Sequence, residues 1–216
     1  MSEAHEPPAR HADLMDGIYR RQRLIYDVTR KYYLFGRDHL IADLRVPQDG
    51  TVLEVACGTG RNLRRIGKTY PGAHLYGLDI SSEMLTSARA TLGAHAQLAQ
   101  ADACTFDGQT TFDRPQFDRI VLSYAISMIP DWTQAIETAA RHLAPSGSLH
   151  IVDFGDQAAL PRLFRRGLRA WLSKFHVSPR DDLAGHLARL AEATGISATT
   201  QPLYRRYAVY AVLQKT

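Results

Sequence analysis

The chain has 216 residues, 45% of them hydrophobic, which is enough to build one substantial core and predicts a single main domain. The longest nearly apolar stretch, 120–129, is too short to cross a bilayer, and residues 1–11 lack the apolar core of a signal peptide, so we expect a cytoplasmic protein. The formal net charge of +4 favours an acidic partner, either nucleic acid or an anionic membrane surface.

The N-terminal part divides into a tail and a helical pattern. Residues 1–12 are expected to form a flexible tail before a domain over 13–216. Apolar and aromatic residues recur at helical spacing through 14–35, and arginines and a lysine lie mostly off that side. This pattern indicates either a helix that packs its aromatic stripe over the site or a basic amphipathic helix on a lipid surface, and both hold if the segment is a lid, within helices spanning 13–45.

The stretch 51–63 predicts a strand, a tight loop and a helix, which is an arrangement that binds nucleotide-like ligands. Gly58 and Gly60 allow unusual backbone angles and close approach of a ligand, and the helix that follows offers free N–H groups. A second apolar run, 74–79, ends in Asp79, and an acid at that strand end can accept both ribose hydroxyls. Glu54 would repel a pyrophosphate, so a cationic cofactor is favoured over NAD.

The remaining elements alternate between strand and helix, which predicts an α/β fold with a mainly parallel sheet. Strands are expected at 97–102, 117–124, 148–154, 196–203 and 207–213, and helices at 61–69, 81–92, 132–143, 160–175 and 181–194. Cys57 and Cys104 have no paired spacing with other Cys or His residues, so neither a disulfide nor a metal site is predicted.

Three stretches resemble the first motifs of class I S-adenosylmethionine-dependent methyltransferases: Glu54-x-Ala56-Cys57-Gly58-x-Gly60, Gly77-Leu78-Asp79-Ile80-Ser81 and Ala101-Asp102-Ala103. The chain departs from the commonest family pattern at Ala56, where alanine replaces a glycine. The resemblance implies S-adenosylmethionine as cofactor and a Rossmann-like, mostly parallel seven-stranded sheet with an antiparallel last strand and an N-terminal helical lid. It implies a cofactor site made by Glu54, Ala56, Gly58, Gly60, Asp79, Ile80, Met84, Asp102, Ala103 and Ser123.

Four further stretches, within 26–38, 123–132, 150–155 and 175–180, resemble bacterial diacylglyceryl-homoserine N-methyltransferases. This resemblance implies three methylations of the amine of diacylglycerylhomoserine, which give a betaine lipid and S-adenosylhomocysteine. Aromatic rings stabilise quaternary ammonium ions, and an amine must lose a proton before it attacks. The expected catalytic residues are Tyr124, Tyr32 and His176, with Asp153 as another proton acceptor, and the expected substrate residues are Tyr26, Tyr33, Arg37, Arg180, Arg205 and Arg206.

A basic segment supports the membrane interpretation. Six basic residues and no acid lie between Gln157 and Arg180, and an apolar stripe runs through 160–175. The segment is either a helix that covers the sheet with a charged solvent face, or a membrane-surface helix. We therefore expect peripheral binding to the inner face of an anionic membrane through 14–35 and 158–175.

Three other functions fit parts of the sequence. A phosphatidylethanolamine N-methyltransferase would share the cofactor and the membrane surface, whereas a soluble methyltransferase of quinone or amino-acid type would need only solvated basic helices. An RNA-binding protein could use the basic segments, but no strand has the aromatic pattern of an RNA-recognition motif, so no nucleic-acid partner is expected.

Overall fold

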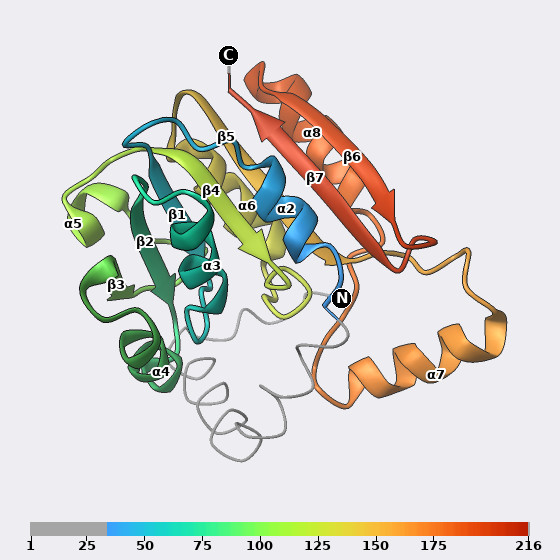
Figure 1. The fold of residues 1–216 in the computed structure, drawn as a ribbon. Helices are drawn as coiled ribbons and strands as arrows, with labels where there is room; N and C mark the ends of the chain where they lie inside the picture. Colours follow the sequence, from blue (N-terminus) through green and yellow to red (C-terminus); the bar gives the residue numbers. More distant parts are fainter. Residues whose placement is uncertain (1–33, 216) are drawn as a thin grey trace.

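A computed structural model describes residues 34–215, in which a seven-stranded sheet runs in the order β3-β2-β1-β4-β5-β7-β6 (Figure 1). The strands are β1 (Thr51–Val55), β2 (His74–Asp79), β3 (Ala96–Gln100), β4 (Phe117–Ser123), β5 (Leu143–Phe154), β6 (Ser197–Leu203) and β7 (Ala208–Gln214). The helices are α2 (Arg37–Asp43), α3 (Arg61–Thr69), α4 (Ser82–Leu92), α5 (Gly108–Phe112), α6 (Trp132–Arg141), α7 (Arg162–Ser173) and α8 (Leu183–Thr194), with a short 3₁₀ turn at Gly93–His95.

The first five strands are parallel, and β7 is antiparallel to both β5 and β6. This confirms the predicted Rossmann-like sheet with its antiparallel last strand. The strand order reverses direction after β1, because β2 and β4 lie on opposite sides of it. Ligands of open parallel sheets bind outside the carboxyl ends of the strands at such a reversal, so the fold itself places the site at the ends of β1, β2 and β4.

Two hydrophobic cores fill the space between the sheet and its helices. On one face, α2, α3 and α4 bury residues such as Leu40, Leu63 and Leu85 against the sheet. On the other face, α6 and α8 bury Ile136 and Leu187, among others. The nearly continuous apolar character of β1 and β4 follows from this two-sided burial.

Helix α7 does not cover the sheet, which was one of the two predicted alternatives for this segment. It begins at Arg162 and ends at Ser173, inside the predicted 160–175, and stands away from the sheet (orange in Figure 1). Leu172 is the only residue of this helix that is fully buried. The apolar stripe read from the sequence therefore packs against the body of the protein over only part of its length.

Several other boundaries differ from the sequence prediction. β5 starts at Leu143 rather than 148, and the short helix α5 was not predicted. The predicted helix over 14–35 and the tail over 1–12 lie outside the described residues, except that 34–36 form a turn before α2 rather than helix. Across 34–215, no helix has the length and apolar character needed to span a membrane.

Candidate active site

The ends of β1 and β2 bring two acids together, as the sequence predicted. Asp79 is 7% exposed, and its carboxylate accepts the backbone N–H of Gly58 at 2.8 Å and that of Ser81 at 2.9 Å. These two hydrogen bonds fix the carboxylate at the junction of the glycine loop and the start of α4. A carboxylate oxygen can accept more than one hydrogen bond, so these contacts leave capacity for a ribose hydroxyl, and the role of Asp79 beside a ribose stays a prediction.

Glu54 lies beside this loop at the end of β1 and is 2% exposed. One carboxylate oxygen accepts the Asn62 side-chain N–H at 2.7 Å, and the other is buried with no hydrogen-bond partner among residues 34–215. Burial raises the pKa of the Glu54 carboxyl to about 7. A buried carboxylate oxygen of this kind fits a cationic ligand, because such a ligand would supply the missing hydrogen bond and stabilise the charge.

Sequence reasoning missed Asn62, the residue that orients Glu54. It lies in the first turn of α3, two positions after Gly60. The sequence feature that could have identified Asn62 is its position, a polar side chain at the start of the helix that follows the glycine loop.

The glycine loop contains three left-handed residues, Ala56 (φ 56°), Gly58 (φ 54°) and Gly60 (φ 72°). A Cβ on Gly60 would lie 2.6 Å from Leu92 of α4, so glycine is required there for packing as well as conformation. At Gly58 an added Cβ would meet nothing within 4 Å, which leaves open space on the ligand side of the loop. Ala56, the departure from the family pattern, adopts a backbone conformation that favours glycine.

The other predicted cofactor residues surround the same edge of the sheet. Asp102 accepts the Cys104 N–H at 2.8 Å in the turn after β3, and Ala103 is buried next to it. Met84 is buried in the first turn of α4, whose N-cap is Ser81, and packs against Met128 and Phe175. Two residues complete this set, the half-buried Ile80 and the buried Ser123, whose hydroxyl has no partner within the described part of the chain.

Tyr124 follows β4 directly and is 2% exposed. Its hydroxyl donates to the backbone carbonyl of Phe35, and its ring packs edge-on against Phe154 at 4.9 Å between centroids. The Arg37 guanidinium carbon lies 5.7 Å from the same ring. Tyr124 therefore ties the segment before α2 to the sheet, and its proposed role beside the reacting amine stays a prediction.

Three of the four predicted substrate arginines, all except Arg205, line two clefts. Arg37 lines a cleft of about 300 Å³ together with Arg61, Asn62 and Arg65 of α3, and Phe35 and Tyr204 line its aromatic side. The rings of Phe35 and Tyr204 have centroids 5.5 Å apart. Because Asn62 also binds Glu54, this cleft lies next to the acidic part of the site.

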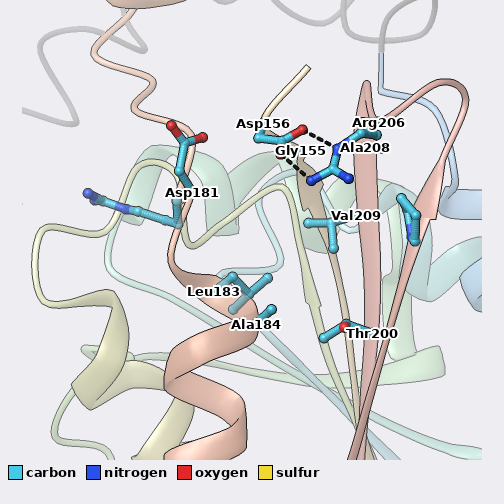
Figure 2. Close-up of a pocket in the computed structure, with 11 residues that line it drawn as sticks. Gly155, Asp156, Asp181, Leu183, Ala184, Thr200, Arg206, Ala208 and Val209 are labelled. Carbon is cyan, nitrogen blue, oxygen red and sulfur yellow. Dashed lines mark hydrogen bonds and ion pairs between the residues drawn. The ribbon is translucent and has the colours of Figure 1, made fainter. Parts of the chain in front are cut away.

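Arg180 and Arg206 line a second cleft, of about 220 Å³ (Figure 2). Figure 2 shows Leu183 and Ala184 at the start of α8 on one side of this cleft and Thr200 and Val209 of the β6–β7 hairpin on the other. Arg206 pairs with Asp156 at its edge.

The donors of Arg180 bind backbone carbonyls. Its guanidinium donates to the carbonyls of Ile126 at 3.0 Å and Ile129 at 2.7 Å. Arg180 therefore positions the loop after β4, in which the Ser127 N–H donates to the buried carboxylate of Asp153 at 3.1 Å. Burial raises the pKa of Asp153 to about 6.

The remaining predicted residues are less constrained. His176 is exposed just after α7, and Arg205 is exposed in the β6–β7 turn. Tyr26, Tyr32 and Tyr33 lie outside the described residues. Among residues 34–215, no group of three or more His, Cys, Asp or Glu side chains could hold a metal ion.

Comparison with known proteins agrees with this geometry. Residues 52–147 match the protein family described as "Methyltransferase domain". The chain is therefore similar to S-adenosylmethionine-dependent methyltransferases, and this similarity supports S-adenosylmethionine as the cofactor.

The relatives act on different substrates. The chain is 30% identical over 158 residues to a ubiquinone/menaquinone biosynthesis C-methyltransferase of Paracoccus denitrificans, covering 70% of this chain and 63% of the relative. It is 32% identical over 126 residues to a trans-aconitate 2-methyltransferase of Streptomyces avermitilis, covering 54% of this chain and 47% of the relative. The chain thus spans less than two thirds of the length of both relatives.

Solved structures share the fold at low sequence identity. A plantazolicin methyltransferase in complex with a desmethylPZN analog and SAH superimposes with a TM-score of 0.72 at 15% identity, covering 97% of this chain and 96% of the other. A phosphoethanolamine N-methyltransferase of Haemonchus contortus superimposes with a TM-score of 0.67 at 16% identity, covering 83% of this chain and 52% of the other. At these identities the likeness concerns the fold.

Proposed function

We propose that this chain transfers a methyl group from S-adenosylmethionine to a small-molecule acceptor. The observation that carries this proposal is the pair of buried acids at adjacent strand ends, Glu54 with one unpartnered oxygen and Asp79 fixed by two loop N–H groups. Glu54 would face the ammonium end of the cofactor, and Asp79 would face the ribose. When bound, the cofactor supplies an electrophilic methyl group on a cationic sulfur.

The residues around this site need only align an acceptor and exclude water, because methyl transfer from a sulfonium is an in-line displacement. Met84 and Phe175 provide apolar walls beside the cofactor edge. Asp153 and Arg180 act as positioning residues, since both hold the loop that follows β4.

The sequence relatives favour a quinone-type small molecule over a lipid amine as the acceptor. Enzymes of ubiquinone and menaquinone biosynthesis recur among the relatives of this chain. A quinone-type acceptor also fits the cleft beside Asn62, where Phe35 and Tyr204 offer aromatic faces and Arg37 offers donors to ring oxygens.

A second candidate acceptor is the amine of diacylglycerylhomoserine. The resemblance of 123–132, 150–155 and 175–180 to that N-methyltransferase family favours it, and so does the exposed apolar and basic surface of α7. With this acceptor, the arginines that line the cleft beside Asn62, namely Arg37, Arg61 and Arg65, would bind the homoserine carboxylate. The phosphate of phosphatidylethanolamine would be a competing anionic group at the same position.

The experiment that separates these acceptors uses the purified chain, methyl-labelled S-adenosylmethionine and four acceptors in parallel. These are a demethylmenaquinone, trans-aconitate, diacylglycerylhomoserine and phosphatidylethanolamine, with products identified by mass spectrometry. Label in the quinone alone would support the first candidate, and mono-, di- and trimethylated homoserine lipid would support the second. Label transfer to none of them, from a protein that binds the cofactor, would contradict both acceptor assignments.

A heated sample and the Asp79→Ala variant serve as controls for cofactor-dependent transfer. Failure of the wild-type protein to bind S-adenosylmethionine at all would contradict the proposed function itself.

A further inference from the structure

The first half of α7 presents large apolar side chains to solvent. Leu163 is 84% exposed and Phe164 is 57% exposed, and both are among the few large hydrophobic side chains with such exposure in the described part of the chain. A Cβ added at Gly167, one turn later, would meet nothing within 4 Å. This part of the helix is therefore open, and exposed apolar side chains of this size are typical of interaction surfaces.

Positive charge surrounds these side chains. Arg162 and Arg166 are exposed beside Leu163 and Phe164, and Arg165 is half-buried. No acidic residue occurs anywhere from Gln157 to Arg180. We name the surface formed by Arg162, Leu163, Phe164, Arg165 and Arg166 the α7 tip.

The second half of the same helix is anchored to the protein near the cofactor edge. Leu172 is 1% exposed, and Arg169 pairs with Asp181 at 2.8 Å. Phe175, just beyond the helix, packs against Met84 in the first turn of α4, beside the proposed cofactor site. The α7 tip lies at the opposite end of the helix from these anchoring contacts and projects away from the sheet (Figure 1).

We propose that the α7 tip is a docking site for an anionic lipid bilayer. Leu163 and Phe164 insert at the level of the headgroups, and Arg162, Arg165 and Arg166 lie against lipid phosphates. Charge complementarity selects this occupant: an apolar partner alone would not account for the arginines, of which Arg162 and Arg166 are exposed and Arg165 also interacts with Asp156. An acidic solute alone would not account for two exposed apolar side chains. The inference is independent of the acceptor proposed above, because docking requires no methyl transfer.

Arg169 does not belong to the docking surface, although it lies in the same basic segment. Its guanidinium donates to the Asp181 carboxylate, to the Asp156 carbonyl at 3.1 Å and to the Gln157 side chain at 3.3 Å. The geometry thus divides the arginines of α7 into an internal anchor and an external contact group.

The test is co-sedimentation of the full chain with vesicles of phosphatidylcholine, alone or mixed with phosphatidylglycerol, at low and high salt. We expect binding to the anionic vesicles, weaker at high salt because salt screens the arginines. Replacing Arg162, Arg165 and Arg166 with Gln should weaken binding by roughly tenfold or more, since each basic residue contributes to attraction at the surface. The double variant Leu163→Ser and Phe164→Ser should also lose binding.

Two matched variants complete the design. Replacing the same three arginines with Lys should keep most of the binding, because the charge is retained. Replacing Arg64, Lys68 and Arg89, which are exposed on α3 and α4, with Gln removes the same charge elsewhere and should leave binding nearly unchanged. Cofactor affinity and circular dichroism verify that every variant is folded.

Four results would overturn the proposal. They are no vesicle binding by the wild-type chain, equal binding to neutral and anionic vesicles, equal losses in the α7 and control triple variants, and self-association through the α7 tip. The last would appear as a wild-type dimer in analytical ultracentrifugation that the Leu163→Ser and Phe164→Ser variant abolishes.

Discussion

The Asp79 carboxylate at the end of β2 accepts the Gly58 N–H at 2.8 Å, and so joins the second strand to the loop that follows the first. This one contact explains why an acid at 79 and a glycine at 58 belong to the same site although 21 residues separate them. The backbone of the loop is oriented by the same carboxylate that is expected to bind the cofactor ribose.

Asp79→Ala should therefore weaken S-adenosylmethionine binding through two effects, loss of the ribose contact and loosening of the glycine loop. The expected loss is about 1.5–3 kcal/mol, the scale of hydrogen bonds to a charged group. Isothermal titration calorimetry measures it, with Glu192→Ala on the exposed side of α8 as a control that should bind like the wild type. Unchanged affinity in Asp79→Ala would remove this residue from the cofactor site.

Affinity for S-adenosylmethionine should fall as the pH drops below about 7, because the Glu54 carboxyl, with its pKa raised to about 7 by burial, becomes protonated in the free protein. The cationic cofactor favours the ionised form, so binding at lower pH must release a proton. The dissociation constant should rise by up to about tenfold per pH unit below that value. Calorimetry in buffers of different ionisation enthalpy measures the proton release directly.

Glu54→Gln is the matched variant for this pH effect. It should bind more weakly at pH 7.5 and lose the dependence between pH 5.5 and 7. A wild-type affinity that stays flat over that range would show that Glu54 does not face the positive charge of the cofactor.

The sequence predicted the strand ends and the glycine loop well because their determinants are local, whereas the cofactor contacts of individual residues stay predictions. Glu54 ends strand β1, Gly58 and Gly60 lie on the loop that follows it, and parallel pairing brings the ends of β1 and β2 together. The extent to which α7 is buried could not be predicted in the same way. Its apolar stripe is equally compatible with a helix packed on the sheet and with a helix exposed at the surface. Arg180 and Arg206 also could not be ranked, because their partners, the Ile126 carbonyl and Asp156, are 54 and 50 residues distant.

A buried series of hydrogen-bonded side chains, away from the cofactor site, predicts a second pH effect, this time on the stability of the protein. His150 lies between Ser148, at 2.8 Å, and the Tyr210 hydroxyl, at 2.7 Å, and that hydroxyl donates to Asp43 at 2.9 Å. Burial lowers the pKa of His150 to about 4. The unfolded chain therefore binds more protons at this residue between pH 6.5 and 4, and the free energy of unfolding should decrease as the pH falls through that window.

His150→Gln isolates this contribution, which should amount to about 2–3 kcal/mol across the window. The difference in unfolding free energy between wild type and variant is the quantity to follow by urea denaturation, because the raised pKa values of Glu54 and Asp153 act in the opposite direction and cancel in the difference. A difference that does not change between pH 7 and 4 would contradict the buried, neutral histidine.

Ala56→Gly should stabilise the protein, since Ala56 has a φ of 56° and an L-residue in this conformation costs about 1–2 kcal/mol. The greater freedom of glycine in the unfolded chain offsets part of the gain, which leaves about 0.5–1 kcal/mol. Ala90→Gly on the exposed side of α4 is the control with the opposite sign, with an expected loss of about 1 kcal/mol. Thermal unfolding of both variants decides whether the loop is strained at Ala56.

The last prediction separates the ring of Tyr124 from its hydroxyl. Burial raises the pKa of this hydroxyl well above its usual value, so it remains a proton donor and binds the Phe35 carbonyl. Tyr124→Phe keeps the ring, which packs against Phe154 and lies near Arg37, and loses one hydrogen bond worth about 1 kcal/mol. Because Phe35 lines the cleft expected to hold the acceptor, the variant should raise KM for the acceptor and keep most of kcat.

Tyr124→Ala should lose kcat as well, because removal of a buried ring leaves a cavity costing about 3–5 kcal/mol and takes away any stabilisation of positive charge near the transferred methyl. Steady-state kinetics with the acceptor identified above, together with cofactor affinity as a measure of folding, distinguish the two substitutions. If Tyr124→Phe were as inactive as Tyr124→Ala while both bound the cofactor normally, the hydroxyl would take part in hydrogen bonding or proton relay at the acceptor. In that case the ring would serve only to place it.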